Sequence, residues 1–465
     1  MMLSRDNADT IAAVATPAGE GGIAVLRVSG PQAIAITDIK FSGARRLTES
    51  ATHTLHFGRF ESGGRTIDTV VASVYRAPHS YTGEDTVELS CHGGYYVSQT
   101  ILAALLAQGA RLAEPGEFTL RAFLNGKLDL AQAEAVADVI HAKSEKSHRA
   151  SVQQLQGSLS RYIGSLRTEL LDLCALFELE LDFADEDITL ADRSDAARAL
   201  DAIRSRITQA VASFRGGRVV REGVKAVLAG KPNAGKSSLL NILLDENRAI
   251  VSPVPGTTRD SIEESITLEG LLFTFIDTAG LRETADEIEQ EGVRRTHSHI
   301  SSADVLVLIV DASTLPSEED LALYRSIERT VSSHTVLIYV FNKSDCEAPG
   351  FREAFAHVHT ANSCTVSCKT HEGIEGFKEL LYRTALPAYD SDAASVTITN
   401  LRHKQSLERA RASLERAERA IAANASGEFV AVDLREALDE LGTVIGLATP
   451  DDILNTIFSK FCIGK

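Results

Sequence analysis

The residues best suited to chemistry are the eight from 230 to 237, which read GKPNAGKS and match the pattern G-x-x-x-x-G-K-[ST]. The apolar run 224–229 before them is expected to be a buried strand, and residues 238–244 after them a helix. This strand–loop–helix order is what a phosphate-binding loop requires, because backbone N–H groups turn toward phosphate oxygens beside a helix N-terminus. We expect Lys236 to reach the terminal phosphates and Ser237 to ligate Mg²⁺. The loop alone leaves a chance match in a glycine-rich turn as the alternative.

Two further segments are placed to complete the phosphate and magnesium site. The four residues Asp277, Thr278, Ala279 and Gly280 end the apolar run 271–276. We expect Asp277 to hold Mg²⁺ through a water molecule and the Gly280 N–H to meet the terminal phosphate. Residues 255–260 (PGTTRD) lie where a first switch segment belongs, and Thr258 would be the second protein ligand of Mg²⁺.

Base recognition is predicted from two loops that follow later apolar strands. Residues 342–345 (NKSD) follow the run 336–341 and resemble the NKxD element of GTPases. The Asp345 carboxylate can accept two hydrogen bonds from guanine, whereas adenine offers no matching pair of donors. Residues 367–369 (SCK) follow a short strand and are expected to form the last guanine loop. An ordinary surface turn is the alternative for NKSD alone, but the five segments together indicate a GTPase.

The residues expected to contact GTP are Asn233, Ala234, Gly235, Lys236, Ser237, Ser238, Ser252, Val254, Pro255, Gly256, Thr257, Thr258, Asp277, Thr278, Ala279, Gly280, Asn342, Lys343, Asp345, Ser367, Cys368 and Lys369. The position at which Ras-like enzymes carry a water-orienting glutamine is Leu281, which can neither donate nor accept a hydrogen bond. The catalytic polar group must therefore come from elsewhere. The acidic stretch 283–291 is mostly expected to be a solvated helix face, although one of its carboxylates could orient water. No nearby arginine has a context that identifies an arginine finger.

Length and charge restrict the class of protein. A chain of 465 residues is expected to hold two to four domains. Its net charge of −17 argues against a general nucleic-acid binder, but leaves open a local basic patch or an RNA surface supplied by a partner. Without a membrane-length apolar run or a signal peptide, and with six scattered cysteines that suggest reduced thiols, we expect a cytoplasmic protein with no membrane partner.

The pattern of apolar residues divides the chain into four segments. Residues 1–126 alternate strand-like stretches with glycine turns and are expected to form an α+β module. Residues 127–220 and 390–465 show helical spacing and suggest one discontinuous all-α domain, into which an α/β P-loop GTPase domain (Ras-like), 221–389, is inserted. Two independent helical domains are the alternative. Thr449 before Pro450 is expected to cap the last helix.

Seven stretches of the chain resemble the MnmE (TrmE) family of tRNA-modification GTPases. They span the N-terminal, helical and GTPase segments and read DTIAAVATPAGEGGIAVLRVSGP, SYTGEDTVELSCHGG, EPGEFTLRAFLNGKLDLAQAEAVADVI, GKPNAGKSSLLN, AIVSPVPGTTRD, IDTAGLRET and the terminal FCIGK. The departures are small: Cys368 replaces a common alanine, and Glu20 stands where a basic residue is frequent. The second departure weakens an anion-binding role for that loop.

The resemblance implies a function for the whole chain. With an FAD- and NADH-dependent partner, MnmG (GidA), it would form an aminomethyl or carboxymethylaminomethyl group on carbon 5 of the wobble uridine of certain tRNAs. The one-carbon unit would come from a tetrahydrofolate derivative bound by a folate-binding-like N-terminal domain. That domain would also make the protein a homodimer, which with the partner would form a heterotetramer or larger complex.

The resemblance also implies roles for individual residues. Folate contacts would be Arg27, Glu88, Lys127 and Lys465, and the thiol of Cys462 would take part in the modification chemistry. Without the resemblance, Arg27 and Glu88 would be interpreted as strand-surface residues and Cys462 as a packing residue.

For hydrolysis, the family binds K⁺ where an arginine finger would sit. The ligands here would be Asn233, Ser252, Val254 and Thr257, with Glu289 orienting the attacking water and hydrolysis coupled to pairing of the GTPase domains. A side-chain hydrogen bond within the loop is the alternative role for Asn233. Two rival functions remain open: a ribosome-assembly GTPase, and a folate enzyme whose GTPase is only regulatory.

Overall fold

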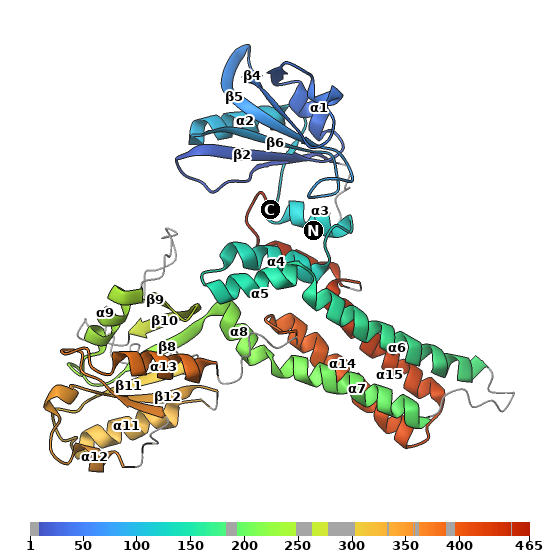
Figure 1. The fold of residues 1–465 in the computed structure, drawn as a ribbon. Coiled ribbons are helices and arrows are strands. Elements are labelled where there is room, and N and C mark those ends of the chain that lie inside the picture. Colours follow the sequence, from blue (N-terminus) through green and yellow to red (C-terminus); the bar gives the residue numbers. More distant parts are fainter. Residues whose placement is uncertain are drawn as a thin grey trace, which may run out of the picture. The chain divides into compact units, whose positions relative to one another are not determined.

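The structure is a computed structural model that describes residues 9–182, 193–247, 263–277, 303–332, 334–356, 358, 362–386, 396–447 and 449–465. The chain divides into two compact units (Figure 1). Unit 1 comprises residues 1–137, 154–197 and 413–465, and unit 2 comprises residues 138–153 and 198–412. The predicted domain boundaries after residues 126, 220 and 389 stay predictions.

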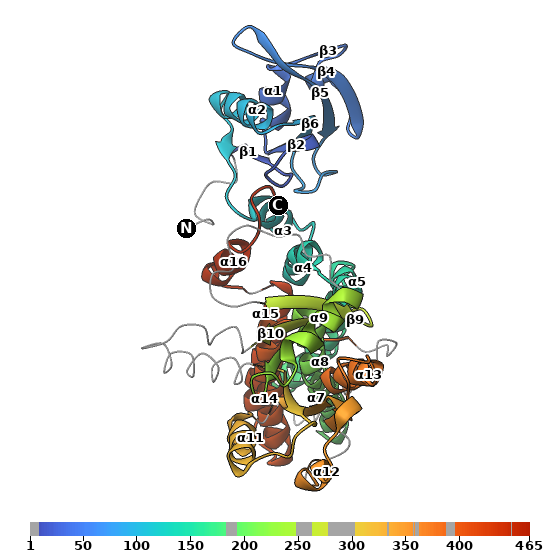
Figure 2. The same ribbon diagram turned by 90° about the vertical axis from the view of Figure 1, so that its left-hand side faces the viewer.

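The N-terminal part of unit 1 is a seven-stranded sheet. The strands are β1 (Ile11–Val14), β2 (Gly21–Ser29), β3 (Phe41–Gly43), β4 (Thr54–Ser62), β5 (Arg65–Tyr75), β6 (Thr86–Gly93) and β7 (Arg111–Leu112). Their order is β3-β4-β5-β6-β2-β1-β7, and all neighbours except β1 and β7 pair antiparallel. Helices α1 (Ala33–Asp38) and α2 (Tyr95–Ala107) cover one face of this sheet (Figure 2).

The opposite face of the sheet, which we call the open face, is exposed over β4 but is buried at β1, where Ile11 and Ala13 pack against Phe118. Leu26 and Val28 of β2 belong to the core beneath α1 and α2. Arg27 between them must point to the other face, because successive side chains of a strand point to opposite sides. Leu55, Ser73, Glu88 and Arg27 form one cross-strand row on this open face.

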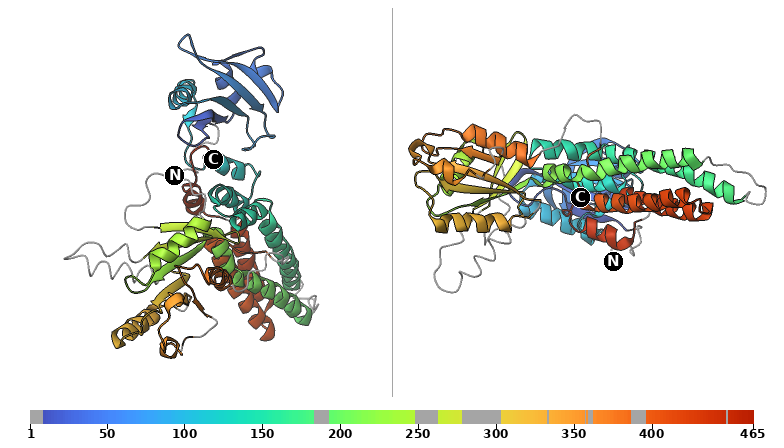
Figure 3. Two further views of the ribbon diagram at one scale, coloured as in Figure 1. Left: turned by 60° about the vertical axis from the view of Figure 1, so that its left-hand side comes forward. Right: turned by 90° about the horizontal axis from the view of Figure 1, so that it is seen from below.

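Helices before and after the GTPase segment pack against one another. They are α3 (Glu117–Leu124), α4 (Leu130–His141), α5 (Glu145–Leu155), α6 (Ser158–Asp182), α7 (Arg193–Ala212), α8 (Phe214–Glu222), α14 (Leu401–Ala422), α15 (Gly427–Ile445) and α16 (Asp451–Phe458). In unit 1, α6 and α15 lie side by side (Figure 3), joined by an ion pair from Arg435 to Glu178 at 2.7 Å. In unit 2, the Ile398 N–H donates to the Ser213 hydroxyl at 3.0 Å. Within the described ranges, no helix is both long enough and apolar enough to cross a membrane.

The last helix begins differently from the sequence expectation. Its capping position is Pro450, whose extended backbone precedes the first helical residue, Asp451. Thr449 therefore lies one residue too early to reach the free N–H groups of the first turn. Its buried hydroxyl oxygen has no hydrogen-bond partner among the described residues. The prediction that Thr449 caps this helix is wrong.

The GTPase segment of unit 2 is a six-stranded sheet between helices. The strands are β8 (Val224–Ala229), β9 (Glu263–Leu268), β10 (Leu271–Asp277), β11 (Val305–Asp311), β12 (Val336–Asn342) and β13 (Ser363–Thr365). The order is β13-β12-β11-β8-β10-β9, with only β9 antiparallel among the described strands. The helices are α9 (Lys236–Asn247), α11 (Glu318–Thr330), α12 (Phe351–Ala354) and α13 (Ile374–Ala385).

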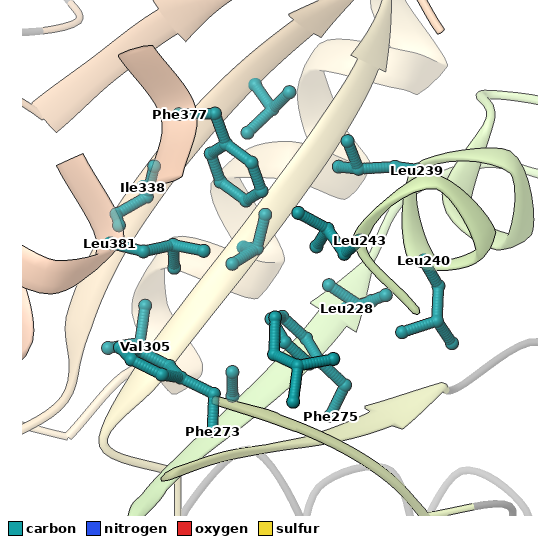
Figure 4. Close-up of a cluster of buried hydrophobic side chains, with 14 of the residues drawn as sticks. Leu228, Leu239, Leu240, Leu243, Phe273, Phe275, Val305, Ile338, Phe377 and Leu381 are labelled. Carbon is teal, nitrogen blue, oxygen red and sulfur yellow. The ribbon is translucent and has the colours of Figure 1, made fainter. Parts of the chain in front are cut away.

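Both faces of this sheet are buried, as its parallel strands require. Val307 and Ile309 of β11 face the core beneath α9 and α13, which contains Leu239 and Phe377 (Figure 4). The alternate residues Leu306, Leu308 and Val310 face a second core with Phe341, Phe351 and Phe355. The predicted fold class, an α+β N-terminal module, helical segments and an α/β P-loop GTPase domain, is confirmed.

The end of α4 and the first turns of α5 belong to the same unit as the GTPase segment. Both Nε and Nη2 of Arg221, on α8, contact Asp138 Oδ1, at 2.9 and 2.7 Å. The Lys146 N–H donates to the carbonyl of Gly270 at 3.2 Å. Gly270 lies in the tight turn between β9 and β10, so the helical segment holds this hairpin at its turn.

Candidate nucleotide-binding site and a second charged site

The loop between β8 and α9 requires glycine at both ends. Gly230 has φ 144°, and a Cβ there would lie 2.3 Å from the carbonyl oxygen of Ile309. Gly235 has φ 101°, and a Cβ would lie 2.0 Å from Nδ2 of Asn342. A side chain at either position would collide with groups that cannot yield easily. The loop thus lies too close to β11 and to the Asn342 side chain for a side chain at either glycine.

Lys236 is held against the carbonyls of its own loop. Its buried ammonium donates to the carbonyl oxygens of Gly230 and Lys231, at 2.9 and 2.8 Å. A buried ammonium needs such acceptors, and a phosphate oxygen would replace them with a charge-assisted bond. Ser237 and Ser238 follow it in the exposed first turn of α9, and the N-terminus of a helix attracts an anion.

Asn233 lies exposed at the tip of the loop. Its φ of 63° is left-handed, a conformation that asparagine tolerates better than most residues. Its side chain makes no hydrogen bond to the residues that the structure describes. The alternative of a loop-stabilising hydrogen bond therefore has no support here, whereas the left-handed backbone gives a separate reason for asparagine.

Asn342 joins the phosphate loop to the last guanine loop. It is 2% exposed, and its Nδ2 donates to the Ala234 carbonyl at 2.8 Å. Its Oδ1 accepts the Cys368 N–H at 3.1 Å. A buried amide with both ends satisfied fixes the distance between two loops far apart in sequence. Burial raises the pKa of the Cys368 thiol despite an opposing hydrogen bond with Asn342.

The Asp345 carboxylate stands at the carboxyl edge of the sheet, in the turn after β12. Its Oδ1 accepts from the Ser367 hydroxyl at 2.7 Å. Lys369 Nζ lies 3.9 Å from Oδ2, but this lysine side chain is 85% exposed and the pair is screened. The structure thus brings together the predicted residues of both guanine loops.

Part of the predicted site lies outside the described residues: Ser252, Val254, Pro255, Gly256, Thr257, Thr258, Thr278, Ala279, Gly280 and Glu289. Asp277 is the last residue of β10, beside Leu228 of β8 in the parallel ladder. Its backbone therefore ends next to the strand that leads into the phosphate loop. Of the predicted metal ligands, the structure describes Ser237 for Mg²⁺ and Asn233 for K⁺, and the ligand roles of all these residues stay predictions.

A second charged site lies on the open face of the N-terminal sheet. Arg27 and Glu88 are register partners on β2 and β6. Arg27 Nε and Nη2 contact the same carboxylate oxygen, Glu88 Oε1, at 2.9 and 2.8 Å. The guanidinium also lies 5.1 Å from the ring centre of Tyr81 and 5.6 Å from that of Phe118. No spacing in the sequence indicated these two aromatic residues.

The C-terminal turn reaches the same site. The Gly464 carbonyl accepts from Arg27 Nη1 at 3.4 Å, and Gly464 has φ 95°. A Cβ on Gly464 would lie 2.8 Å from the Val14 carbonyl oxygen, so the chain passes close to β1. Burial lowers the pKa of the half-buried Lys465 ammonium, as does the charge of Arg27, while Glu88 opposes the shift. Cys462 is exposed, and its carbonyl accepts N–H groups of Gly116 and Lys465.

Lys127 lies beside the loop that carries Tyr81. Its Nζ donates to the Pro78 carbonyl at 3.1 Å. The structure thus places Arg27, Glu88 and Lys465 together and Lys127 on the neighbouring loop.

A buried charge network holds the start of β1 to α3. Arg121 is 2% exposed and contacts Glu84, Asp9 and Glu117. Burial alone would raise the pKa of the Asp9 and Glu117 carboxyls, but hydrogen bonds from Arg111 and Arg121 outweigh it and lower both. Such carboxylates stabilise the folded state above their ordinary pKa values of 3.8 and 4.5. This stabilisation is lost as the pH falls through their lowered folded values.

We expect Arg121→Met to lower the free energy of unfolding of the N-terminal module by about 3–5 kcal/mol at neutral pH, since it removes the cation that pairs with Glu84 and leaves Asp9 and Glu117 to Arg111 alone. It should also flatten the acid-induced loss of stability. Urea unfolding between pH 7 and pH 3, followed by tyrosine fluorescence, measures both effects. Arg59→Met is the control, because Arg59 is 61% exposed and its pair with Glu61 is a surface pair. Equal stabilities of the two variants would contradict the network's role.

Comparison with known proteins identifies relatives along nearly the whole chain. Residues 130–462 match the family profile described as the MnmE helical domain, and residues 10–127 match the profile described as the GTP-binding protein TrmE N-terminus. The protein named tRNA modification GTPase MnmE from Christiangramia forsetii is 44% identical over 98% of this chain and 99% of its own length. The protein of the same name from Salinibacter ruber is 46% identical over the same shares.

Proposed function

Since the chain belongs to the MnmE family of tRNA modification GTPases, we propose that it couples GTP hydrolysis to a folate-dependent change of the wobble uridine. With an FAD- and NADH-dependent partner of the MnmG (GidA) type, it forms the aminomethyl or carboxymethylaminomethyl group at carbon 5 of that uridine. The observation that carries the proposal is that one chain contains two separate sites. One is formed by the nucleotide loops that Asn342 joins, and the other is the Arg27–Glu88 pair with the C-terminal turn beside it.

The nucleotide loops divide recognition of GTP between them. The loop 230–235 surrounds the phosphates with N–H groups, and Lys236 supplies a positive charge. Ser237 and Thr258 would hold Mg²⁺, with Asp277 acting through water, and the ion would neutralise phosphate charge. Asp345 accepts hydrogen bonds from the guanine edge, in an orientation fixed by Ser367.

The loop also fits a monovalent cation. The Asn233 side chain is exposed and makes no hydrogen bond to the described residues, so its oxygen is available as a ligand. With oxygens of Ser252, Val254 and Thr257 it would hold K⁺ beside the phosphates. A cation there offsets the charge that develops between the leaving and transferred groups.

We expect GTP turnover to be at least tenfold faster in K⁺ than in Na⁺ at equal ionic strength, because one missing charge-stabilising group costs about 10²–10³ in rate. Phosphate release measured with wild type and Asn233→Ala checks this, with pairing of the GTPase domains followed in parallel. The variant should lose the difference between the two ions while still binding GTP. Equal wild-type rates in the two salts would contradict the ion proposal.

The Arg27–Glu88 site supports folate binding in a revised form. Arg27 is engaged by Glu88 and by Gly464, so its role is to orient Glu88 toward the donor groups of a pterin ring. We assign the acidic tail of folate to Lys465 and Lys127, two cations that the structure describes near the site. Cys462 lies three residues from Lys465 and is exposed, so its thiol is accessible for the modification chemistry.

We expect Glu88→Gln to weaken binding of a tetrahydrofolate derivative about 10- to 100-fold, the loss that follows removal of a charged acceptor. Equilibrium dialysis with 5-formyltetrahydrofolate measures this, and the melting temperature verifies the fold. Glu61→Gln is the matched control, since the Glu61 side chain on β4 is 45% exposed and pairs only at the surface with Arg59. Unchanged affinity in Glu88→Gln would remove Glu88 from the folate site.

The open face of the N-terminal sheet also supports a homodimer. Leu55 and Phe57 of β4 are 71% and 73% exposed on this face, and Ile23 of β2 is 68% exposed. Apolar side chains gathered on one face favour burial against another surface. A second copy is the proposed occupant, and the partner protein would join this dimer in the cytoplasm. The partner would also supply most of the tRNA surface, because the chain itself carries a net charge of −17.

A further inference from the structure

The carboxylate of Asp311 lies beside the NKSD segment, and Asp311 belongs to none of the five GTPase segments identified in the sequence. Asp311 is the last residue of β11 and pairs in register with Asn342 of β12. Its Oδ2 accepts from Lys343 Nζ at 2.5 Å. Its Oδ1 accepts from the N–H and the hydroxyl of Ser313, at 2.9 and 2.6 Å. Both carboxylate oxygens therefore accept hydrogen bonds, and one of these bonds comes from Lys343 of the NKSD segment.

Lys343 stands between two residues with fixed tasks. Asn342 before it joins the two loops, and Asp345 after it is oriented by the Ser367 hydroxyl and is the proposed reader of guanine. Lys343 itself has φ 65°, a left-handed conformation that is unfavourable for a residue with a Cβ. Such a conformation persists only where the surroundings determine it. The ion pair with Asp311 is the contact that fixes the far end of this side chain.

The charge on Asp311 is maintained by its surroundings. Burial raises the pKa of this carboxyl, but the hydrogen bonds from Lys343 and Ser313 outweigh burial and lower it. At neutral pH the carboxylate is ionised and the pair is a charge-assisted hydrogen bond, which is shorter and stronger than a neutral one. This ion pair therefore restricts the Lys343 side chain to one conformation before a nucleotide binds.

We propose that Asp311 is a positioning residue for guanine: it holds Lys343 so that the four-carbon stem lies beside the base while Asp345 reads the base edge. The inference rests on the proposed recognition of GTP by these loops. It assigns Asp311 to binding rather than to hydrolysis, because its carboxylate contacts Lys343 of the base loop and Ser313 after β11, and makes no hydrogen bond to the phosphate loop among the described residues.

The test is Asp311→Asn, which keeps the side-chain shape and an oxygen for Ser313 but removes the charge that holds Lys343. We expect the dissociation constants of GTP and GDP to rise about tenfold, the fold-change that loss of one charge-assisted bond gives. KM for GTP should rise with them, while kcat at saturating GTP stays unchanged. Asp311→Glu should recover part of the affinity. Glu347→Gln is the control, because Glu347 pairs with Arg352 on the surface nearby and should leave affinity unchanged.

A double-mutant cycle separates positioning from a general loosening of the fold. Lys343→Met keeps an unbranched stem without its charge, so Asp311→Asn should add no further loss of affinity to it. Additive losses, or a fall of kcat in Asp311→Asn, would overturn the proposal. An unchanged affinity for GTP in Asp311→Asn would also overturn the role of Asp311, but it would leave the assignment of the nucleotide site unaffected. Failure of the wild-type chain itself to bind GTP would instead overturn the assignment of the nucleotide site.

Discussion

Asp345→Asn is expected to exchange guanine for xanthine as the preferred base. In the structure the Ser367 hydroxyl donates to Asp345 Oδ1. An asparagine keeps that contact only with its oxygen toward Ser367, which turns its amide N–H₂ toward the base. The amide then meets the N–H donors of guanine as a second donor, but it matches the carbonyl that xanthine carries at the same edge. We expect GTP to bind about 10²- to 10⁴-fold more weakly, since two charged hydrogen bonds are lost.

Titration with fluorescent GTP and xanthosine triphosphate measures this exchange. Xanthosine triphosphate should bind the variant more tightly than GTP does, and should support its hydrolysis. A folded Asp345→Asn that still preferred GTP would show that the base edge is read by another residue. A variant that bound neither nucleotide at an unchanged melting temperature would contradict the orientation assigned to Ser367.

Glu289→Ala is expected to abolish turnover and leave GTP binding intact. Leu281 cannot orient water, so another polar group must do so, and the family resemblance assigns that task to Glu289. Loss of a positioned general base or water-orienting group lowers kcat by about 10²–10⁴. The dissociation constant for GTP should not change, because the group acts on water rather than on the nucleotide.

Single-turnover hydrolysis combined with a nucleotide titration measures both quantities on the same preparation. Glu291→Ala is the control, because its carboxylate belongs to the same acidic stretch and is expected to be solvated. Wild-type turnover in Glu289→Ala would remove the proposed role. Loss of GTP binding in a folded Glu289→Ala would also contradict it.

The nucleotide site was the most predictable part of the molecule, because its signals are local. An apolar run followed by GKPNAGKS gives a strand, a loop and a helix, and the structure has β8, the loop and α9 in that order. Polar residues that follow parallel strands meet at the carboxyl edge of the sheet. For this reason Asn342, Asp345 and Ser367 come together although their segments are separate in sequence.

The second charged site depends on contacts that sequence spacing does not encode. Arg27 and the Gly464 carbonyl meet across 437 positions, and only the resemblance suggested that Arg27 shares a site with the neighbouring Lys465. Their geometry also changed an expectation: Arg27 and Glu88 bind each other rather than standing as two separate ligand contacts. The aromatic rings of Tyr81 and Phe118 were missed, since single aromatic residues in a mixed sequence are usually core residues.

The most direct measurement traces the one-carbon unit into tRNA. The chain is incubated with its FAD-dependent partner, unmodified tRNA, GTP, NADH, K⁺, an ammonium or glycine donor and a tetrahydrofolate derivative with an isotopically labelled one-carbon group. Mass spectrometry of the digested nucleosides then shows whether the label lies in the substituent at carbon 5 of the wobble uridine. We predict labelled product with the wild-type chain and none with Glu289→Ala. Unlabelled product would contradict folate as the source of the one-carbon unit. If GTP were hydrolysed but no modified nucleoside formed, the alternative of a GTPase without modification chemistry would be favoured.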